Sequence, residues 1–385
     1  MKNQNVRNAV LASLGLLALT AYILACTSFS PDDTKVLYPA FDGPSGKLGV
    51  AVYDRQTGRS ETLFLPLDLG GGDTNAVNTP LLRPQWLADG RRVLVAWGSD
   101  SDLALALVPC GVRGSVKLFF NLSKNSEYGQ ALVSPVPVAG ERAFLMESEN
   151  AVLRLDLQTG ARVRHEFAAE KSGLSLWPVP LDKGVFYFSQ KDPAVFGRLD
   201  PDTFQQTPLA TFTNKIAEGS FFAYDRQGKR IALVEDAPSG PSLLVLESGT
   251  TVFRRALAGK GEEFSFGNAV FAPNGNTLLA GYRLQNTGQT NASFGLMEIP
   301  LGDALIRKTP LISAADTSDK AAALYFQIGV SHDAKTAAVA STYLACASKD
   351  FNPADCALFF VDLRDPGRKV TKIPIPLPAE RPSLK

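Results

Sequence analysis

The residue with the clearest chemical role is Cys26, because of the segment that precedes it. Lys2 and Arg7 are followed by an unbroken run of apolar or small residues over positions 9–25. A basic start and an apolar run are typical of a secretory signal. An uncleaved transmembrane anchor is the alternative, but the run is at the short limit of the roughly 17–25 residues that cross a bilayer as a helix.

The apolar run ends in the letters ILAC, with Cys26 last, and this motif resembles the lipobox of bacterial lipoproteins. The resemblance implies that residues 1–25 are a cleaved signal peptide, that the Cys26 thiol is acylated with diacylglycerol, and that residues 26–28 form a lipidated N-terminus. Leu24 departs from the Ala or Ser that is usual at its position. Two or more acyl chains anchor a protein stably without a spanning helix. Since Thr27 is not the Asp that marks inner-membrane retention, we expect an exported protein on the outer membrane, at its periplasmic face or on the cell surface.

The other three cysteines lie in the mature chain. Cys346 and Cys356 flank the segment SKDFNPAD. An exported protein lies in an oxidising compartment, where such a pair persists, so we expect a disulfide between Cys346 and Cys356. A metal site would need more thiols or a nearby histidine. Cys110 stands alone in a turn with no base beside it, and we expect it to be a structural thiol.

Bases and metal ligands are scarce. Of the two histidines, we expect His165 to be solvated on an outer strand and His332 to serve a turn. Asp100 and Asp102 lie in the segment GSDSDL, and Asp-rich loops can hold calcium, but a polar hairpin turn explains these residues better. Motifs that attach c-type haem or cradle phosphates are absent from the sequence. We therefore expect no catalytic residue, no metal and no cofactor.

The composition argues for a globular chain that does not bind nucleic acid. Lys and Arg number 39 against 38 Asp and Glu, so no excess of positive charge gathers phosphate groups. A hydrophobic content of 45% allows a large buried core.

A turn motif recurs along the mature chain at the spacing of a repeat fold. Each copy has an apolar or aromatic strand end, a tight polar turn and an apolar strand, and such turns reverse the chain between two strands. The copies read FSPDDTKVLYPAF, WLADGRRVLVAW, SPVPVAGERAFLM, WPVPLDKGVFYFS, YDRQGKRIALVED, FAPNGNTLLAGY and VSHDAKTAAVAS. A second hairpin follows each copy, as in VAVYDRQTG and LRLDLQTG. Seven units of four strands are the pattern of a seven-bladed β-propeller.

The FSPDG-type turn resembles the repeats of TolB-like and WD-repeat propellers. The resemblance implies an all-β fold, with a single propeller over residues 29–378 and a C-terminal tail over 379–385; six or eight blades are the alternatives. We expect the final strand, positions 369–377, at the outer edge of the last blade, where its prolines are tolerated.

The first repeat begins at Phe29, and only Thr27 and Ser28 separate it from Cys26. A full innermost strand would place Cys26 inside the ring. Its acyl chains must remain in the bilayer, because each methylene withdrawn into water costs about 0.8 kcal/mol. We therefore expect the first blade to lack its innermost strand or to keep only a stub of it.

The long loops favour a binding function. In a propeller, loops between blades and loops between second and third strands emerge on one face, and here the long ones cover 68–82, 283–294 and 344–357. The candidate interaction residues in them are Gly70, Asp73, Asn75, Asn286, Asn291, Lys349 and Phe351. We expect a non-catalytic protein-interaction or scaffold subunit of a membrane-associated envelope complex, with protein partners.

Two other functions stay open. A lactonase-like hydrolase would need carboxylates and a metal in the central channel, whereas the innermost segments carry mostly Ser, Gln, Gly and aromatic residues. A small-ligand or glycan site at the channel mouth would use Trp86, Trp177 and Tyr325, although we expect each of these to pack in the core.

Overall fold

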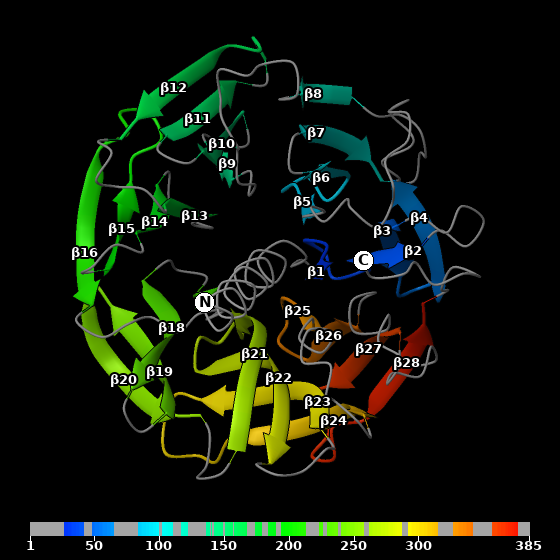
Figure 1. Cartoon of the computed structure of the whole chain (residues 1–385). Helices are drawn as coiled ribbons and strands as arrows, with labels where there is room; N and C mark the ends of the chain where they lie inside the picture. The colour runs from blue at the N-terminus through cyan, green and yellow to red at the C-terminus, as the bar shows by residue number, and fades with distance from the viewer. Residues whose placement is uncertain are drawn as a thin grey trace, which may run out of the picture.

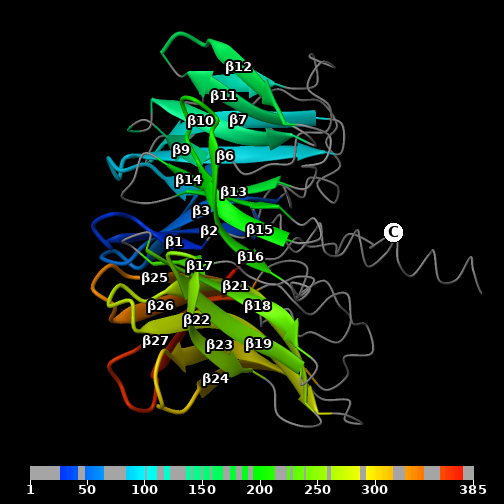
Figure 2. The ribbon, with the colours of Figure 1, turned by 90° about the vertical axis from the view of Figure 1, so that its left-hand side faces the viewer.

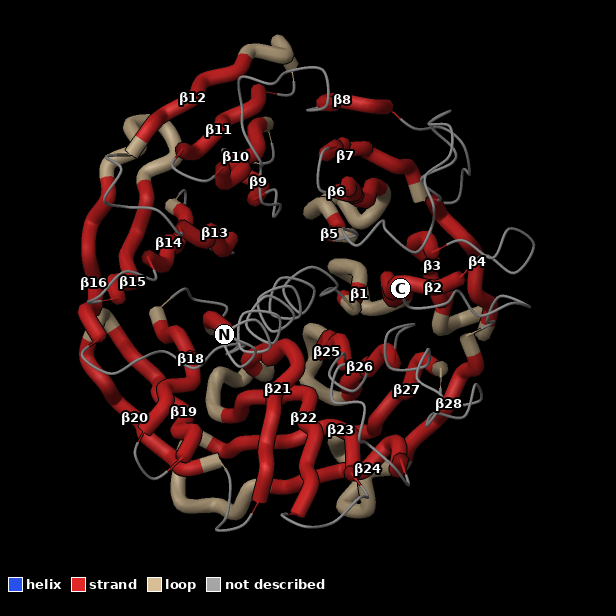
Figure 3. The backbone as a smooth tube through the Cα atoms, in the orientation of Figure 1, coloured by secondary structure: helices blue, strands red, loops and turns tan. Residues whose placement is uncertain are grey.

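Figure 1 shows the computed structural model of the chain. The structure describes residues 27–41, 48–64, 84–99, 102–110, 117–121, 136–138, 140, 142–148, 151–156, 158–167, 174–178, 184–189, 194–212, 223–225, 229–237, 240–257, 262–286, 292–314, 326–341 and 356–375. These ranges contain only strands, turns and connecting residues, as Figure 3 shows by colour. They include no helix that could serve as a membrane span.

The strands form seven sheets, each of four antiparallel strands in chain order. Blade one contains β1 (Ser28–Phe29), β2 (Lys35–Phe41), β3 (Leu48–Asp54) and β4 (Arg59–Phe64). Blade two contains β5 (Gln85–Trp86), β6 (Arg92–Ser99), β7 (Asp102–Pro109) and β8 (Lys117–Asn121). Blade three contains β9 (Val136–Val138), β10 (Ala143–Ser148), β11 (Ala151–Asp156) and β12 (Arg162–Glu166).

The remaining blades repeat this order. Blade four contains β13 (Leu174–Pro178), β14 (Val185–Ser189), β15 (Ala194–Leu199) and β16 (Gln206–Phe212). Blade five contains β17 (Ala223–Tyr224), β18 (Arg230–Ala237), β19 (Gly240–Glu247) and β20 (Thr250–Ala256). Blade six contains β21 (Glu262–Phe271), β22 (Thr277–Asn286), β23 (Ala292–Pro300) and β24 (Arg307–Ala314). Blade seven contains β25 (Phe326–Val330), β26 (Thr336–Ser341), β27 (Ala357–Asp362) and β28 (Val370–Pro374).

The seven sheets are arranged as a ring, with the first strand of each sheet innermost (Figure 1). β1 of blade one lies against β25 of blade seven, so the ring closes between the two ends of the chain. In the part of the chain that the structure describes, each blade is built from consecutive strands, and no strand of blade one completes blade seven. The expected outermost position of the final strand is confirmed, because β28 pairs only with β27.

This topology gives the ring two different faces. Turns that join first to second and third to fourth strands lie on one face, which we call the tight-turn face. Connections between second and third strands and between blades belong to the other, which we call the loop face. In Figure 2 the ring is seen from the side, and the β25–β26 and β27–β28 turns, orange and red, lie on its left.

Aspartate side chains form the tight turns by accepting hydrogen bonds from the backbone of the next residues. In the third-to-fourth turn of blade one, Asp54 Oδ1 accepts from the Gln56 and Thr57 amides at 2.9 and 2.8 Å. Asp156 and Asp200 repeat this arrangement in blades three and four. Short polar side chains of this kind compete well for local backbone groups, which explains why the arrangement recurs in these turns.

Buried apolar clusters join neighbouring blades. The cluster that closes the ring combines Phe29, Val36 and Tyr38 of blade one with Ala340 and Leu358 of blade seven. Other clusters join blades one and two, two and three, three and four, four and five, five and six, and six and seven. Face-to-face packing of sheets therefore runs around the whole ring, and burial of these apolar surfaces is its main stabilising force.

The innermost strand of blade one is a stub, as expected. β1 is two residues long and pairs Ser28 with Leu37 and Phe29 with Val36. The stub is not special to blade one, however. β5 is equally short, and Pro84, described directly before it, lies outside the strand.

Candidate functional site

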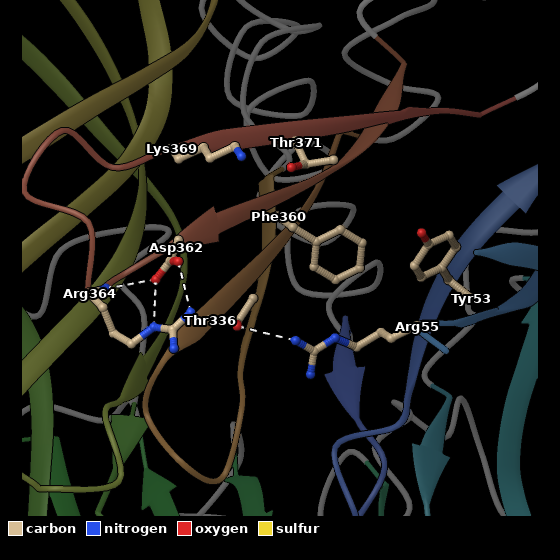
Figure 4. A pocket seen from close by; sticks show the side chains of 8 residues that line it. All are labelled: Tyr53, Arg55, Thr336, Phe360, Asp362, Arg364, Lys369 and Thr371. Carbon is tan, nitrogen blue, oxygen red and sulfur yellow. Dashed lines mark hydrogen bonds and ion pairs between the residues drawn. The ribbon is translucent and has the colours of Figure 1, made fainter. Parts of the chain in front are cut away.

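A hollow of about 320 Å³ lies at the seam between blade one and blade seven (Figure 4). Its lining combines aromatic, cationic and hydroxyl side chains. The lining residues are Tyr53, Arg55, Thr336, Phe360, Asp362, Arg364, Lys369 and Thr371. Tyr53 and Arg55 come from the end of β3 and the turn after it, and the other six come from β26, β27, the β27–β28 turn and β28. The hollow therefore opens on the tight-turn face and exists only because the ring closes.

Arg55 crosses the seam. Its Nη1 donates to the Asp33 carbonyl at 2.8 Å, and its Nη2 donates to Thr336 Oγ1 at 3.3 Å. The guanidinium also lies over the rings of Phe29 and Phe360, 5.3 and 6.0 Å from their centroids. These contacts fix the plane of the guanidinium although its side chain is exposed.

Arg364 and Asp362 form an ion pair inside the lining. Arg364 Nε and Nη2 donate to the two carboxylate oxygens of Asp362 at 3.1 and 2.9 Å. These bonds and the backbone amide of Arg364 lower the pKa of Asp362 to about 2, and the same carboxylate raises the pKa of Arg364. Both groups therefore stay charged at neutral pH.

Two aromatic rings form part of the lining. The Tyr53 and Phe360 rings lie with their centroids 5.2 Å apart and their planes tilted by 41°. Figure 4 shows the two guanidinium groups on either side of Thr336, with the aromatic rings and the Lys369 amino group around the same space.

A second polar contact crosses the same seam next to the hollow. The Asp33 carboxylate accepts hydrogen bonds from the His332 amide at 2.9 and 2.8 Å, and its Oδ1 lies 2.6 Å from His332 Nδ1. We expected His332 to serve a turn. The structure adds that this turn is held by a carboxylate of blade one, 299 residues away in the chain.

Near the channel, the chain that follows Cys26 is packed between blades seven and two. Thr27 is 3% exposed. A Cβ atom built on Gly329 would lie 2.5 Å from the Thr27 carbonyl oxygen, so only glycine permits this approach. On the other side, the Trp86 indole donates to the Ser28 carbonyl at 3.2 Å. Trp86 thus packs against the stub, which agrees with the packing role expected for it.

Most of the predicted interaction residues lie outside the described residues. These are Gly70, Asp73, Asn75, Asn291, Lys349 and Phe351, together with the lipid-attachment residue Cys26 and the channel-mouth candidate Tyr325. Their roles stay predictions.

Asn286 needs a correction. We expected it in a loop that begins at residue 283, but it is the last residue of β22 and pairs with Glu262. Strong apolar and aromatic residues in β22 extend the hairpin with β23, so the segment between the two strands covers only 287–291.

Two cysteines are described. Cys356 is 2% exposed and is disulfide-bonded, while its predicted partner, Cys346, lies outside the described residues. Cys110 is a free, half-buried thiol. Burial raises its pKa, although the Lys35 amino group, 3.8 Å from its sulfur, opposes the shift. A neutral thiol is a weak nucleophile, which fits a structural role.

Other titratable residues show no grouping for metal chemistry. In the described ranges, no group of three or more His, Cys, Asp or Glu side chains could hold a metal ion. Asp102 starts β7 and pairs with Ser99, consistent with a hairpin turn. His165 was expected to be solvated, but it is partly buried, stacked on Phe204 of the next blade with the centroids 4.9 Å apart.

Comparisons with known proteins agree with this architecture. No protein-family model matches the chain, and a search of curated proteins found no match. Among solved structures, it is similar to a hydrazine synthase of Kuenenia stuttgartiensis (TM-score 0.50, 10% identity, 71% of this chain and 74% of that one). It is also similar to a chain of a mitotic checkpoint complex (TM-score 0.50, 14% identity, 83% and 88%). The chain is a seven-bladed β-propeller.

A third similar structure is an oligogalacturonate lyase in complex with manganese (TM-score 0.49, 13% identity, 75% of each chain). At these identities a likeness shows the fold alone, because propellers with unrelated functions share it.

Sequence reasoning did not find the hollow. Arg55, Thr336 and Lys369 look like ordinary turn and strand residues, and only ring closure brings them together. One signal did exist beside them. The first turn reads FSPDD, with Asp33 where the corresponding turns WLADG and FAPNG have glycine. Asp33 has a φ of 60°, so a non-glycine residue occupies a left-handed position, which is uncommon enough to indicate a role.

Proposed function

We propose that this propeller is anchored to a membrane through an acylated Cys26 and acts as a non-catalytic protein-interaction subunit of an envelope complex. The exported location, the outer-membrane destination and the protein partner all belong to this proposal.

The observation that carries the proposal is the packing of Thr27. Because Thr27 is buried against Gly329 and its neighbour Ser28 is bonded by Trp86, the chain is fixed from the first residue after Cys26. The Cα atom of Cys26 lies about 3.8 Å from that of Thr27 by peptide geometry. An acyl group on Cys26 would therefore join the ring without a flexible tether. A propeller held in this way presents a fixed orientation, which suits a subunit of an assembly.

The direction of β1 gives the orientation. β1 runs from the loop face toward the tight-turn face, so the described chain enters blade one at Thr27 from the side of the loop face. The acyl chains would leave the ring on that side and draw the loop face toward the bilayer. The proposed docking residues, including Asn75, Asn291 and Lys349, would then meet a partner at the membrane surface.

The test is co-purification of the full chain from membranes in mild detergent. Alanine at Asn75, Asn291 and Lys349 should reduce the yield of a co-purifying protein about tenfold, as expected for the loss of about 1.4 kcal/mol of binding. The matched control is Lys229→Ala, an exposed lysine on the tight-turn face, which should leave the yield unchanged. If no protein co-purifies, or if only the control variant loses it, the proposal is wrong.

A further inference from the structure

We propose that the hollow at the seam of blades one and seven binds a carboxylate, carried on an apolar stem and supplied by an acidic segment of a protein partner. This inference rests on the proposed interaction function and gives the chemistry of one contact.

The lining of the hollow has an excess of positive charge. The lining carries three cations, Arg55, Arg364 and Lys369, and one carboxylate, Asp362. Asp362 is already bonded by two nitrogens of Arg364. Among the described residues, Arg55 and Lys369 form no ion pair with any carboxylate. Two positive charges that share a hollow repel each other, and an incoming anion would relieve that repulsion.

The Arg55 guanidinium is held in place before any ligand binds. Arg55 uses one nitrogen on the Asp33 carbonyl and one on Thr336 Oγ1. A guanidinium has five N–H donors, so donors remain for a ligand. Because Arg55 is already stacked over Phe29 and Phe360, it loses little side-chain entropy when a ligand binds.

The hollow is small and partly apolar. A volume of about 320 Å³ is near the lower end of the usual ligand pockets, about 300–1,000 Å³, so it fits one or two side chains better than a large cofactor. The Tyr53 and Phe360 rings offer an apolar surface to the stem of the ligand, beside the cations that would bind its charged end.

The same lining favours a carboxylate over a phosphate. A planar guanidinium matches the two oxygens of a carboxylate. The Tyr53 and Phe360 rings beside the cations suit an acid carried on an apolar stem, which inorganic phosphate lacks.

The location suits a protein that approaches from the aqueous side. The hollow is on the tight-turn face, which would point away from the lipid if the loop face is drawn to the bilayer. An acidic peptide segment could reach it there without competing with contacts at the membrane surface.

The experiment titrates the detergent-purified full chain with four probes by calorimetry. The probes are the peptide acetyl-Ala-Phe-Glu-Ala-amide, its Gln counterpart, benzoate and inorganic phosphate. The Glu peptide should bind, and the Gln peptide should bind about tenfold more weakly or not at all. Lys369→Met should weaken binding of the Glu peptide about tenfold, because it removes one cation from the lining. The Lys369 side chain forms no hydrogen bond or ion pair within the described chain, so its loss should not disturb the fold.

Lys229→Met is the matched control, since it removes an exposed lysine of the same face outside the hollow, and it should bind the Glu peptide as the wild type does. Arg55→Gln is a second variant. Its melting curve is recorded beside the titration, because Arg55 also links blades one and seven. If benzoate binds and neither peptide does, the hollow binds a free small acid. That result would overturn the proposal that a protein partner supplies the carboxylate.

Equal binding of the Glu and Gln peptides, tighter binding of phosphate, or insensitivity to Lys369→Met would overturn the site itself. A negative calorimetry result would not refute the proposed lipid anchor, because acylation of Cys26 and co-purification through the loop face are measured separately.

Discussion

At the residue scale, left-handed turn positions are occupied by glycines and by a few larger residues that contact a neighbouring blade. Gly58, Gly90, Gly160 and Gly275 occupy such positions with φ between 62° and 70°. Three larger residues do the same elsewhere: Asp33, Phe204 and Arg368, with φ of 60°, 58° and 55°.

Each of these three reaches the neighbouring blade. Asp33 bonds the His332 turn, Phe204 stacks on His165, and Arg368 pairs with Glu298. A left-handed conformation costs a residue with a Cβ about 1–2 kcal/mol, and these contacts offset that cost. Ala334 and Ser248 occupy similar positions with small side chains, so the rule holds for the large residues only.

Carboxylates of the tight turns predict a loss of stability in acid. The Ser331 hydroxyl, 2.7 Å from Asp333, lowers the pKa of that carboxyl from 3.8 to about 2. Backbone amides of Thr57, Thr159 and Thr203 lower the pKa of Asp54, Asp156 and Asp200. Because the folded pKa of Asp333 lies below the unfolded one, this carboxylate stabilises the fold fully above about pH 4 and loses that effect as the pH falls toward 2. The lowered pKa values of Asp54, Asp156 and Asp200 act in the same direction.

Asp333→Asn should therefore flatten the acid limb of the stability curve. The variant keeps an acceptor for the turn but no longer titrates, so its free energy of unfolding should fall less steeply between pH 4 and pH 2. Urea unfolding at several pH values measures this. Asp303→Asn, whose side chain forms no hydrogen bond or ion pair within the described chain, serves as control and should follow the wild type. An unchanged slope in Asp333→Asn would show that this carboxylate does not contribute.

At the element scale, arginines reinforce the seams between consecutive blades. Arg255 of β20 donates to the Ala304 carbonyl of blade six at 2.8 Å, and Arg307 of β24 donates to the Pro366 carbonyl of blade seven at 2.8 Å. An ion pair also links blades six and seven: Arg368 donates to Glu298 of β23 at 2.7 and 2.9 Å. The side chains of Arg368 and Glu298 are 15% and 10% exposed, so this pair is largely shielded from water.

Glu298→Leu should destabilise the ring by about 2–3 kcal/mol, because it leaves the Arg368 guanidinium buried without its partner. The double variant with Arg368→Leu should recover part of that loss, since both charges are then gone. Urea unfolding of the wild type, the two single variants and the double variant gives the coupling energy. Strictly additive effects would mean that the two side chains do not act as a pair.

The elements were largely predictable from sequence, and the links between them were not. All seven predicted turn copies lie at first-to-second strand reversals, because local Asp, Asn and Gly chemistry determines where the chain turns. Position 286 was misplaced since a loop composition rich in Asn and Gln does not show where strand pairing stops. Arg55 and Thr336 were missed because their contact spans 281 residues and has no local pattern.

At the scale of the whole molecule, ring closure is the decisive feature. It is made by face-to-face packing of blades one and seven, by Arg55 and Asp33, and by the stub that follows Cys26. The same seam therefore combines the closure of the fold, the point where the anchor would enter, and the cationic hollow. A subunit built in this way would hold lipid on one face and offer a carboxylate site on the other.

Acylation of Cys26 would determine how the propeller is held, and mass spectrometry of the protein from the membrane fraction measures it. If Cys26 is the acylated N-terminus, the terminal peptide should begin at Cys26 and carry diacylglycerol, and Cys26→Ser should remove the lipid mass. A chain that retains Met1, or one cut elsewhere with an unmodified Cys26, would contradict the account.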